Sequence, residues 1–190
     1  MSIDARLAEL GITLPQAAAP VAAYVPTVEA NGLLHISGQI ALAPDGLMTG
    51  RLGEDRDLDY GVAAARVCGL NLIAQMKAAL GSLDRVERIV KLGAFISSAA
   101  DFTDQPKVAN GASELMVDVF GDAGKHARSA VGVPVLPLGA VVNRDAFVVH
   151  GGIGLHTSTV EQLNALQRSK WGIEIDELLW SGELSGICSI

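Results

Sequence analysis

Residues 126–143 read HARSAVGVPVLPLGAVVN and carry more structural information than any other segment of this chain. Two Val-rich runs, 129–136 and 140–149, are separated by Pro137, Leu138 and Gly139. β-Branched residues favour strands, and proline with glycine marks a turn. The segment therefore predicts two strands that pair with each other and close a sheet.

Arg128 places a permanent positive charge at the start of these runs, between Ala127 and Ser129. A guanidinium is costly to desolvate unless an anion pairs with it, and its planar fork suits a carboxylate better than lysine would. Two interpretations remain open at this point. Arg128 either binds a small carboxylate ligand or forms an ion pair at a subunit interface.

Outward from this segment, the sequence predicts helices at 3–10, 58–80 and 103–120, and strands at 24–29, 33–41 and 86–96. Asp57 and Gly81 are suited to begin and end the long helix. Asn31-Gly32 is a strong signal for a two-residue hairpin turn. The order predicts an α+β fold in which two helices pack on one mainly antiparallel sheet. With few charges in its strands, the other face of the sheet is expected to pack against further subunits.

Composition limits the classes of function. The chain has 190 residues, 49% of them apolar, and a formal net charge of −7. Without a run of Lys or Arg to follow phosphates, nucleic-acid binding is disfavoured. Cys68 and Cys188 lack the spacing of a metal or disulfide framework, and no apolar segment is long enough to span a membrane. We expect a cytoplasmic protein without a metal or cofactor.

The chain changes character after residue 150. Gly151, Gly152 and Gly154 form a flexible joint, and both tryptophans, Trp171 and Trp180, occur only beyond it. We therefore predict a domain over residues 1–150 and a C-terminal tail over 151–190. The tail is either a genuine extension or a non-native sequence.

Four motifs together resemble one known family. They are YVP at 24–26, LHISGQI at 34–40, QPKVANGAS at 105–113 and ARSAVGV at 127–133. Over residues 6–149 the chain resembles the RidA or YjgF-type reactive intermediate deaminases, also called endoribonuclease L-PSP and chorismate-mutase-like proteins. The longer subgroup, which has an N-terminal helix, is the most similar.

The resemblance implies a homotrimer whose sheets meet in a central barrel, with three clefts at the subunit boundaries. In deaminating members an arginine holds the carboxylate of a 2-imino or 2-enamino acid, and water releases ammonia and a 2-keto acid without any cofactor. Carried over to this chain, the arginine is Arg128, and Tyr24 and Ser37 shape the pocket. Ala130 lines it where some relatives have a cysteine, which excludes thiol chemistry there.

Each matching residue also has a simpler structural interpretation. Tyr24 could be a core aromatic whose hydroxyl reaches the rim, and Ser37 could be a turn residue at a strand edge. His35 and His126 have no paired acid at motif spacing, so we interpret both as surface or structural histidines.

Asn143 departs from the family, which places a glutamate fifteen residues after the arginine. Asn can orient a water but cannot take its proton, and general-base catalysis typically contributes about 10²–10⁴-fold in rate. Asp145 would lie on the same strand face, and could replace the acid only if a bulge shifted the strand. Regular strand alternation assigns Arg144, between these two residues, to the apolar side.

The resemblance implies hydrolytic deamination of reactive imino or enamino acids, and Asn143 is expected to weaken it. One alternative is a non-catalytic binder of small keto or imino acids, which needs Arg128 but no base. The other is an RNA-directed endoribonuclease or translation inhibitor, against which the negative charge and the few aromatic residues argue.

Overall fold

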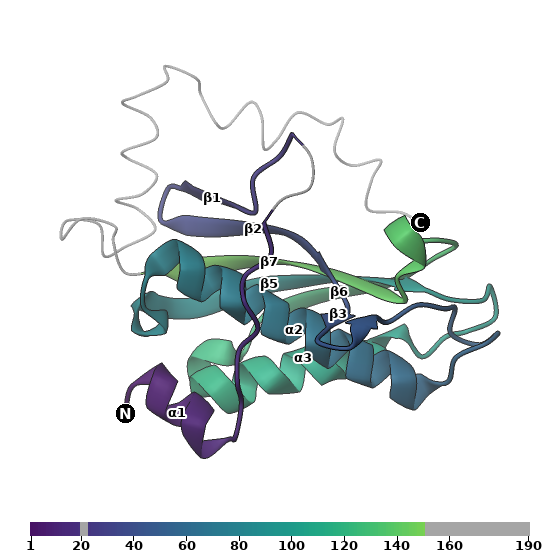
Figure 1. Cartoon of the computed structure of the whole chain (residues 1–190), viewed down its shortest axis with the longest axis horizontal. Coiled ribbons are helices and arrows are strands. Elements are labelled where there is room, and N and C mark those ends of the chain that lie inside the picture. The colour runs from purple at the N-terminus through teal and green to yellow at the C-terminus, as the bar shows by residue number, and fades with distance from the viewer. Residues whose placement is uncertain (20–22, 151–190) are drawn as a thin grey trace, which may run out of the picture. The chain divides into compact units, whose positions relative to one another are not determined.

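In the computed structural model, which describes residues 1–19 and 23–150, the longest helix begins and ends where the sequence predicts (Figure 1). Helix α2 spans Leu58–Leu80. The Asp57 side chain accepts a hydrogen bond from the Tyr60 backbone N–H at 2.8 Å, and Gly81 ends the helix with a φ of 75°. Its apolar stripe is buried along the whole length, which fixes α2 on the sheet.

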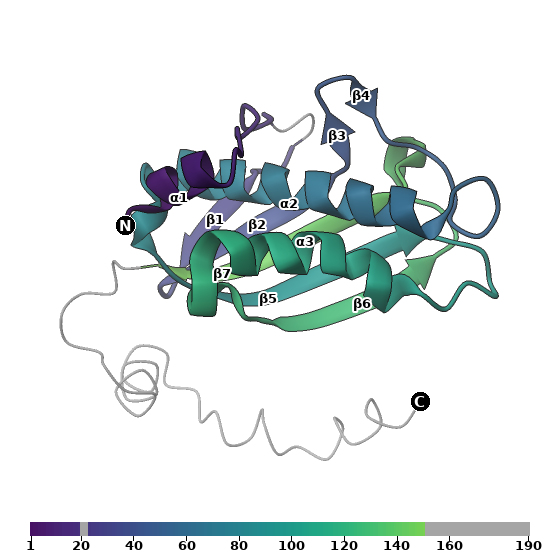
Figure 2. The same ribbon diagram turned by 90° about the horizontal axis from the view of Figure 1, so that it is seen from below.

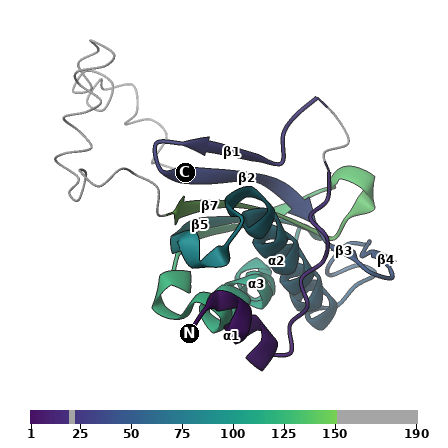
Figure 3. The same cartoon turned by 60° about the vertical axis from the view of Figure 1, so that its left-hand side comes forward.

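Two further helices complete the helical layer. Helix α3 (Gln105–Phe120) begins two residues later than predicted, with Asp104 at its N-cap position. Gly111 allows α3 to approach the α2 backbone at Val62 so closely that a Cβ there would collide. Helix α1 (Ile3–Glu9) lies beside α3, as Figure 3 shows, and buries Leu7.

The main sheet has the strand order β1-β2-β7-β5-β6. The strands are β1 (Thr27–Ala30), β2 (Leu33–Ile40), β5 (Val86–Ser97), β6 (Ala127–Val133) and β7 (Val142–His150). All neighbours pair antiparallel except β5 and β6, which are parallel. The β1–β2 turn has positive φ at both Asn31 (50°) and Gly32 (73°), as the hairpin signal predicts. Strands β3 (Leu42–Ala43) and β4 (Gly46–Leu47) form a separate small hairpin.

The predicted pairing of the last two strands is wrong. Strands β6 and β7 do not pair with each other, because β5 lies between them. Strand β6 follows β5 through the crossover helix α3, which brings it back parallel on one side of β5. The other side of β5 then accepts β7, which becomes the central strand, so Val142 and Val148 are buried rather than at an edge.

The two faces of the sheet differ sharply. Helices α2 and α3 cover one face, where Leu92, Ile96 and Val148 are fully buried (Figure 2). No helix of the described residues covers the other face, which we call the open face. It exposes Val28 (50%), Phe95 (39%) and Val131 (46%). Apolar side chains gathered on one exposed face are typical of a surface that contacts another protein.

The predicted tail, 151–190, lies outside the described residues. Among the residues that are described, no helix is both long and apolar enough to cross a membrane.

Candidate functional site

Arg128 lies on the edge strand β6 and points toward the helix layer. Its Nη1 donates to Asn110 Oδ1 at 2.8 Å and to Ser113 Oγ at 3.2 Å. Asn110 and Ser113 are three residues apart on α3, so they face the same side of that helix. These two bonds use both Nη1 protons and fix the orientation of the guanidinium.

The rest of the fork is available to a ligand. Within the described part of the chain, neither Nε nor Nη2 of Arg128 donates a hydrogen bond, and no carboxylate pairs with this arginine. A carboxylate needs two parallel N–H donors, and Nε with Nη2 supplies such a pair. Asn110 and Ser113, both neutral, thus orient the guanidinium and leave its charge and two of its nitrogens for an anion.

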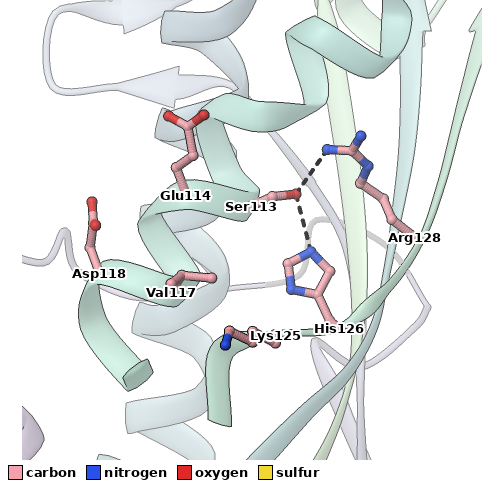
Figure 4. A pocket seen from close by; sticks show the side chains of 7 residues that line it. All are labelled: Ser113, Glu114, Val117, Asp118, Lys125, His126 and Arg128. Carbon is pink, nitrogen blue, oxygen red and sulfur yellow. Dashed lines mark hydrogen bonds between the residues drawn. The ribbon is translucent and has the colours of Figure 1, made fainter. Parts of the chain in front are cut away.

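A cavity of about 510 Å³ opens beside Arg128 (Figure 4). It is lined by residues of α3 and of the segment that leads into β6: Ser113, Glu114, Val117, Asp118, Lys125, His126 and Arg128. The cavity is open to solvent and carries both signs of charge. It is large enough for a small organic acid.

His126, which the sequence did not single out as a site residue, lines this cavity. Its Nδ1 is 2.6 Å from the Gly124 carbonyl oxygen, and its Nε2 is 3.1 Å from Ser113 Oγ. A carbonyl only accepts, so Nδ1 carries the proton and Nε2 accepts from the Ser113 hydroxyl. Burial, with smaller contributions from Arg144 and Arg128, lowers the pKa of His126 although the Gly124 bond opposes this. No sequence signal links the two residues, which are thirteen positions apart.

Tyr24 and Ser37 lie elsewhere in the fold. Tyr24 precedes β1 and lines a second, mainly apolar cavity of about 570 Å³, together with Gly38 and Leu138. Ser37 lies on β2 and donates from Oγ to the Val25 carbonyl at 2.8 Å. Both residues belong to the β1–β2 side of the sheet, whereas Arg128 belongs to the opposite edge.

Asn143 lies on the open face of the central strand. It packs against Gly38, where an added Cβ would approach Asn143 Oδ1 to 2.7 Å. The Oδ1 atom is buried and has no hydrogen-bond partner among the described residues. Asn143 therefore shares a neighbourhood with Ser37 but not with Arg128, which points to the other face of the sheet.

The strand does not shift to bring Asp145 into the place of Asn143. Strand β7 pairs with β5 in regular register from Asn143 to Asp145, opposite Phe95 and Gly93. The irregularity of this region lies in β2, between Ile36 and Gln39. Asp145 thus stays two positions along the open face, beside Gly93.

Arg144 is completely buried under the helices, on the side that strand alternation predicts. Its Nη2 donates to the Ala109 carbonyl at 3.0 Å, while Nε and Nη1 have no partner in the part of the chain described. Burial lowers the pKa of Arg144 to about 10, and burial raises the pKa of the neighbouring Cys68 thiol to about 12. Ala130 follows Arg128 on the same face and packs on the cluster that contains Cys68.

A single chain thus brings together Arg128, Ser113 and His126, but not the whole predicted set. Tyr24 and Ser37 lie toward the β1–β2 edge of the sheet, and Asn143 packs against Gly38, which lines the same cavity as Tyr24. No group of His, Cys, Asp or Glu in the described residues could hold a metal ion.

The chain resembles known proteins in both sequence and structure. A family model described as "YjgF/chorismate_mutase-like, putative endoribonuclease" matches residues 4–150. Protein TCP17 of Trypanosoma cruzi is 52% identical over 148 residues, which is 77% of this chain and 92% of that protein.

Two solved structures extend the comparison. A crystal structure from Shewanella oneidensis MR-1, described as that of a "putative endoribonuclease", superposes on this chain with a TM-score of 0.76 and 34% sequence identity. The match covers 78% of this chain and 99% of that one. E. coli TdcF with bound serine superposes with a TM-score of 0.52 and 25% identity, covering 71% and 94%.

Proposed function

The chain belongs to the YjgF/chorismate-mutase-like family, and from this premise we propose that it hydrolyses small 2-imino or 2-enamino acids to 2-keto acids and ammonia. The observation that carries the proposal is the orientation of Arg128. Asn110 and Ser113 hold one side of its guanidinium, and Nε with Nη2 remain for a carboxylate at the cavity. The E. coli relative crystallised with serine, a small molecule with a carboxylate beside a nitrogen-bearing carbon.

The proposed chemistry needs few groups. Arg128 binds the carboxylate and holds C2 of the imine in place. A water oxygen adds to C2, the C–N bond then breaks, ammonia leaves and the 2-keto acid remains. The buried, unpartnered Oδ1 of Asn143 can accept a hydrogen bond from such a water but cannot remove its proton. The missing acid predicts a slow enzyme.

Assembly joins the two groups of residues in this proposal. Arg128 lies at the β6 edge of the sheet, and Tyr24 and Ser37 lie near the β1 edge. Contact between unlike edges of successive copies is heterologous, and such contacts form a closed ring when the rotation allows it. We propose a homotrimer in which the open faces enclose a central barrel and cover Val28, Phe95 and Val131. Each cleft would then combine Arg128 of one copy with Tyr24, Ser37 and Asn143 of the next.

The experiment generates 2-iminopropionate in situ with an amino acid oxidase and follows its conversion to pyruvate and ammonia. Wild type should accelerate the conversion over buffer, and Arg128→Ala should abolish the acceleration. Arg66→Ala, which removes an exposed arginine on α2, is the matched control and should retain full activity. No acceleration by wild type, or full activity in Arg128→Ala, would refute the proposal.

A non-catalytic binder of keto or imino acids is the second candidate, favoured specifically by Asn143. It uses the same Arg128 fork and needs no proton acceptor. Calorimetric titration with 2-ketobutyrate separates the two candidates. Binding that requires Arg128, without turnover of the imine, selects the binder.

A further inference from the structure

The cavity beside Arg128 contains a hydroxyl–imidazole pair whose reactivity the proposed deamination does not use; there Ser113 only helps to hold the guanidinium. Ser113 Oγ lies 3.1 Å from His126 Nε2, and Arg128 Nη1 donates to the same oxygen (Figure 4). We propose that Ser113 is a nucleophile activated by His126, and that this cavity cleaves small esters that carry a carboxylate. This activity is distinct from imine hydrolysis.

The geometry meets the usual requirements for an activated serine. The nucleophile and the base must be within hydrogen-bonding reach, and a third group must orient the base. Here the Gly124 carbonyl is the third group, because it accepts from Nδ1 at 2.6 Å. That bond leaves Nε2 unprotonated and directed at the Ser113 hydroxyl. A backbone carbonyl thus has the orienting role that a carboxylate has in the familiar triad.

The charges around the pair favour a neutral imidazole and a developing alkoxide. Three positive charges lie near His126. Arg128 on β6 and the buried Arg144 on β7 both act on its pKa, and Lys125 precedes it in the sequence and lines the same cavity. Glu114 and Asp118 of α3 line the same cavity. Burial and the two arginines lower the pKa of His126, so the imidazole is unprotonated at neutral pH and able to accept a proton.

The reaction balances as an acyl transfer to water. Ser113 Oγ attacks the ester carbonyl while its proton passes to His126 Nε2. The alkoxy group leaves with that proton, and an acyl-serine forms. Water then attacks the acyl-serine and gives a proton to Nε2, which passes it to Ser113 Oγ as the acid is released, so that the serine hydroxyl and the neutral imidazole are restored.

The position of Arg128 indicates which class of ester would bind. Its Nη1 binds Ser113 Oγ, and its Nη2 and Nε are available one nitrogen further along the same plane. A ligand carboxylate bound there lies a short distance from the nucleophile. Monoesters of short dicarboxylic acids satisfy both contacts, whereas simple esters satisfy only one.

A fluorophosphonate probe tests the nucleophile directly, without any deaminase assay. Ser113 would displace fluoride from phosphorus, and peptide mass spectrometry would locate the adduct. We expect labelling of Ser113 in wild type, none at this position in Ser113→Ala, and slowing by about 10²–10⁴-fold in His126→Asn, which removes the proton acceptor. Ser129→Ala removes a hydroxyl on the opposite face of β6 and should label like wild type.

Ester hydrolysis gives the second readout. With buffer rates subtracted, wild type should cleave a 4-nitrophenyl monoester of glutaric acid faster than 4-nitrophenyl acetate, and Arg128→Ala should remove that preference. The rate should rise with pH through a pKa below the ordinary value for histidine and then level off. No adduct on Ser113, or equal labelling rates in wild type and His126→Asn, would overturn the proposal.

Discussion

Replacing the buried Arg144 by methionine should stabilise the protein. The guanidinium is 0% exposed, it donates one hydrogen bond, to Ala109, and two of its nitrogens have no partner in the described residues. A buried charge without compensation costs stability, and apolar replacements of buried ionic groups are often stabilising. Methionine keeps the long unbranched shape and brings no charge.

The pKa of Arg144 gives the magnitude. Burial lowers it from 12.5 to about 10, which corresponds to about 3 kcal/mol of unfavourable free energy for the charged form. Loss of the bond to Ala109 offsets about 1 kcal/mol of the gain. The expected net stabilisation is about 2 kcal/mol, or an increase of about 4–8 °C in Tm for a domain of this size.

Urea and thermal unfolding followed by circular dichroism measure the effect. Arg66→Met removes an exposed arginine from α2 and should stay within about 0.5 kcal/mol of wild type. A loss of more than about 1 kcal/mol in Arg144→Met would contradict the argument. It would mean that the folded protein supplies Arg144 with a compensating anion.

Three further predictions concern His126, the open face and Gly38. Because the folded pKa of His126 is lowered from 6.5, the unfolded chain binds more protons below that pH. Stability should therefore fall as pH decreases from about 6.5 toward the folded pKa, and this loss should be absent from unfolding curves of His126→Asn. Phe95→Asp places a charge on the open face and should convert trimers to folded monomers in sedimentation velocity; an intact trimer would refute the barrel. Gly38→Ala forces a Cβ against Asn143 and should cost about 1–3 kcal/mol in urea unfolding, whereas wild-type stability would show that Asn143 moves freely.

Local signals predicted the parts of the fold that depend on neighbours in sequence. Asp57 and Gly81 fixed both ends of α2, and Asn31-Gly32 fixed the β1–β2 turn. The sequence wrongly paired β6 with β7 because their true partner is β5, which ends about thirty residues before β6 begins and lies between the two strands. The alternation of apolar residues identifies a strand but does not show which other strand it pairs with.

The spatial arrangement of the candidate site residues depends on the fold more than on the sequence around each of them. Arg128, singled out from its sequence context, lines a cavity, and its neutral partners Asn110 and Ser113 come from a helix that the sequence did not connect with it. Ser113 and His126 carry no motif, since the α3 helix and the turn after it bring them together only in the folded chain. Strand alternation places Asn143 and Arg144 on opposite faces of the sheet, as the structure has them. The position of Tyr24 near the β1–β2 edge, far from Arg128, does not follow from its spacing in the sequence.

The central position of β7 has a consequence for synthesis on the ribosome. Until residues 142–150 emerge, the β1–β2 hairpin and the β5–α3–β6 unit have no strand to join them, because β7 pairs with both β2 and β5. A nascent chain ending at residue 141 should therefore be cleaved readily by proteases, and protection should arise in one step once the last strand is free. Folding of this domain therefore waits for its last strand, and until that strand is free the chain is exposed to the chaperones that bind unpaired strands.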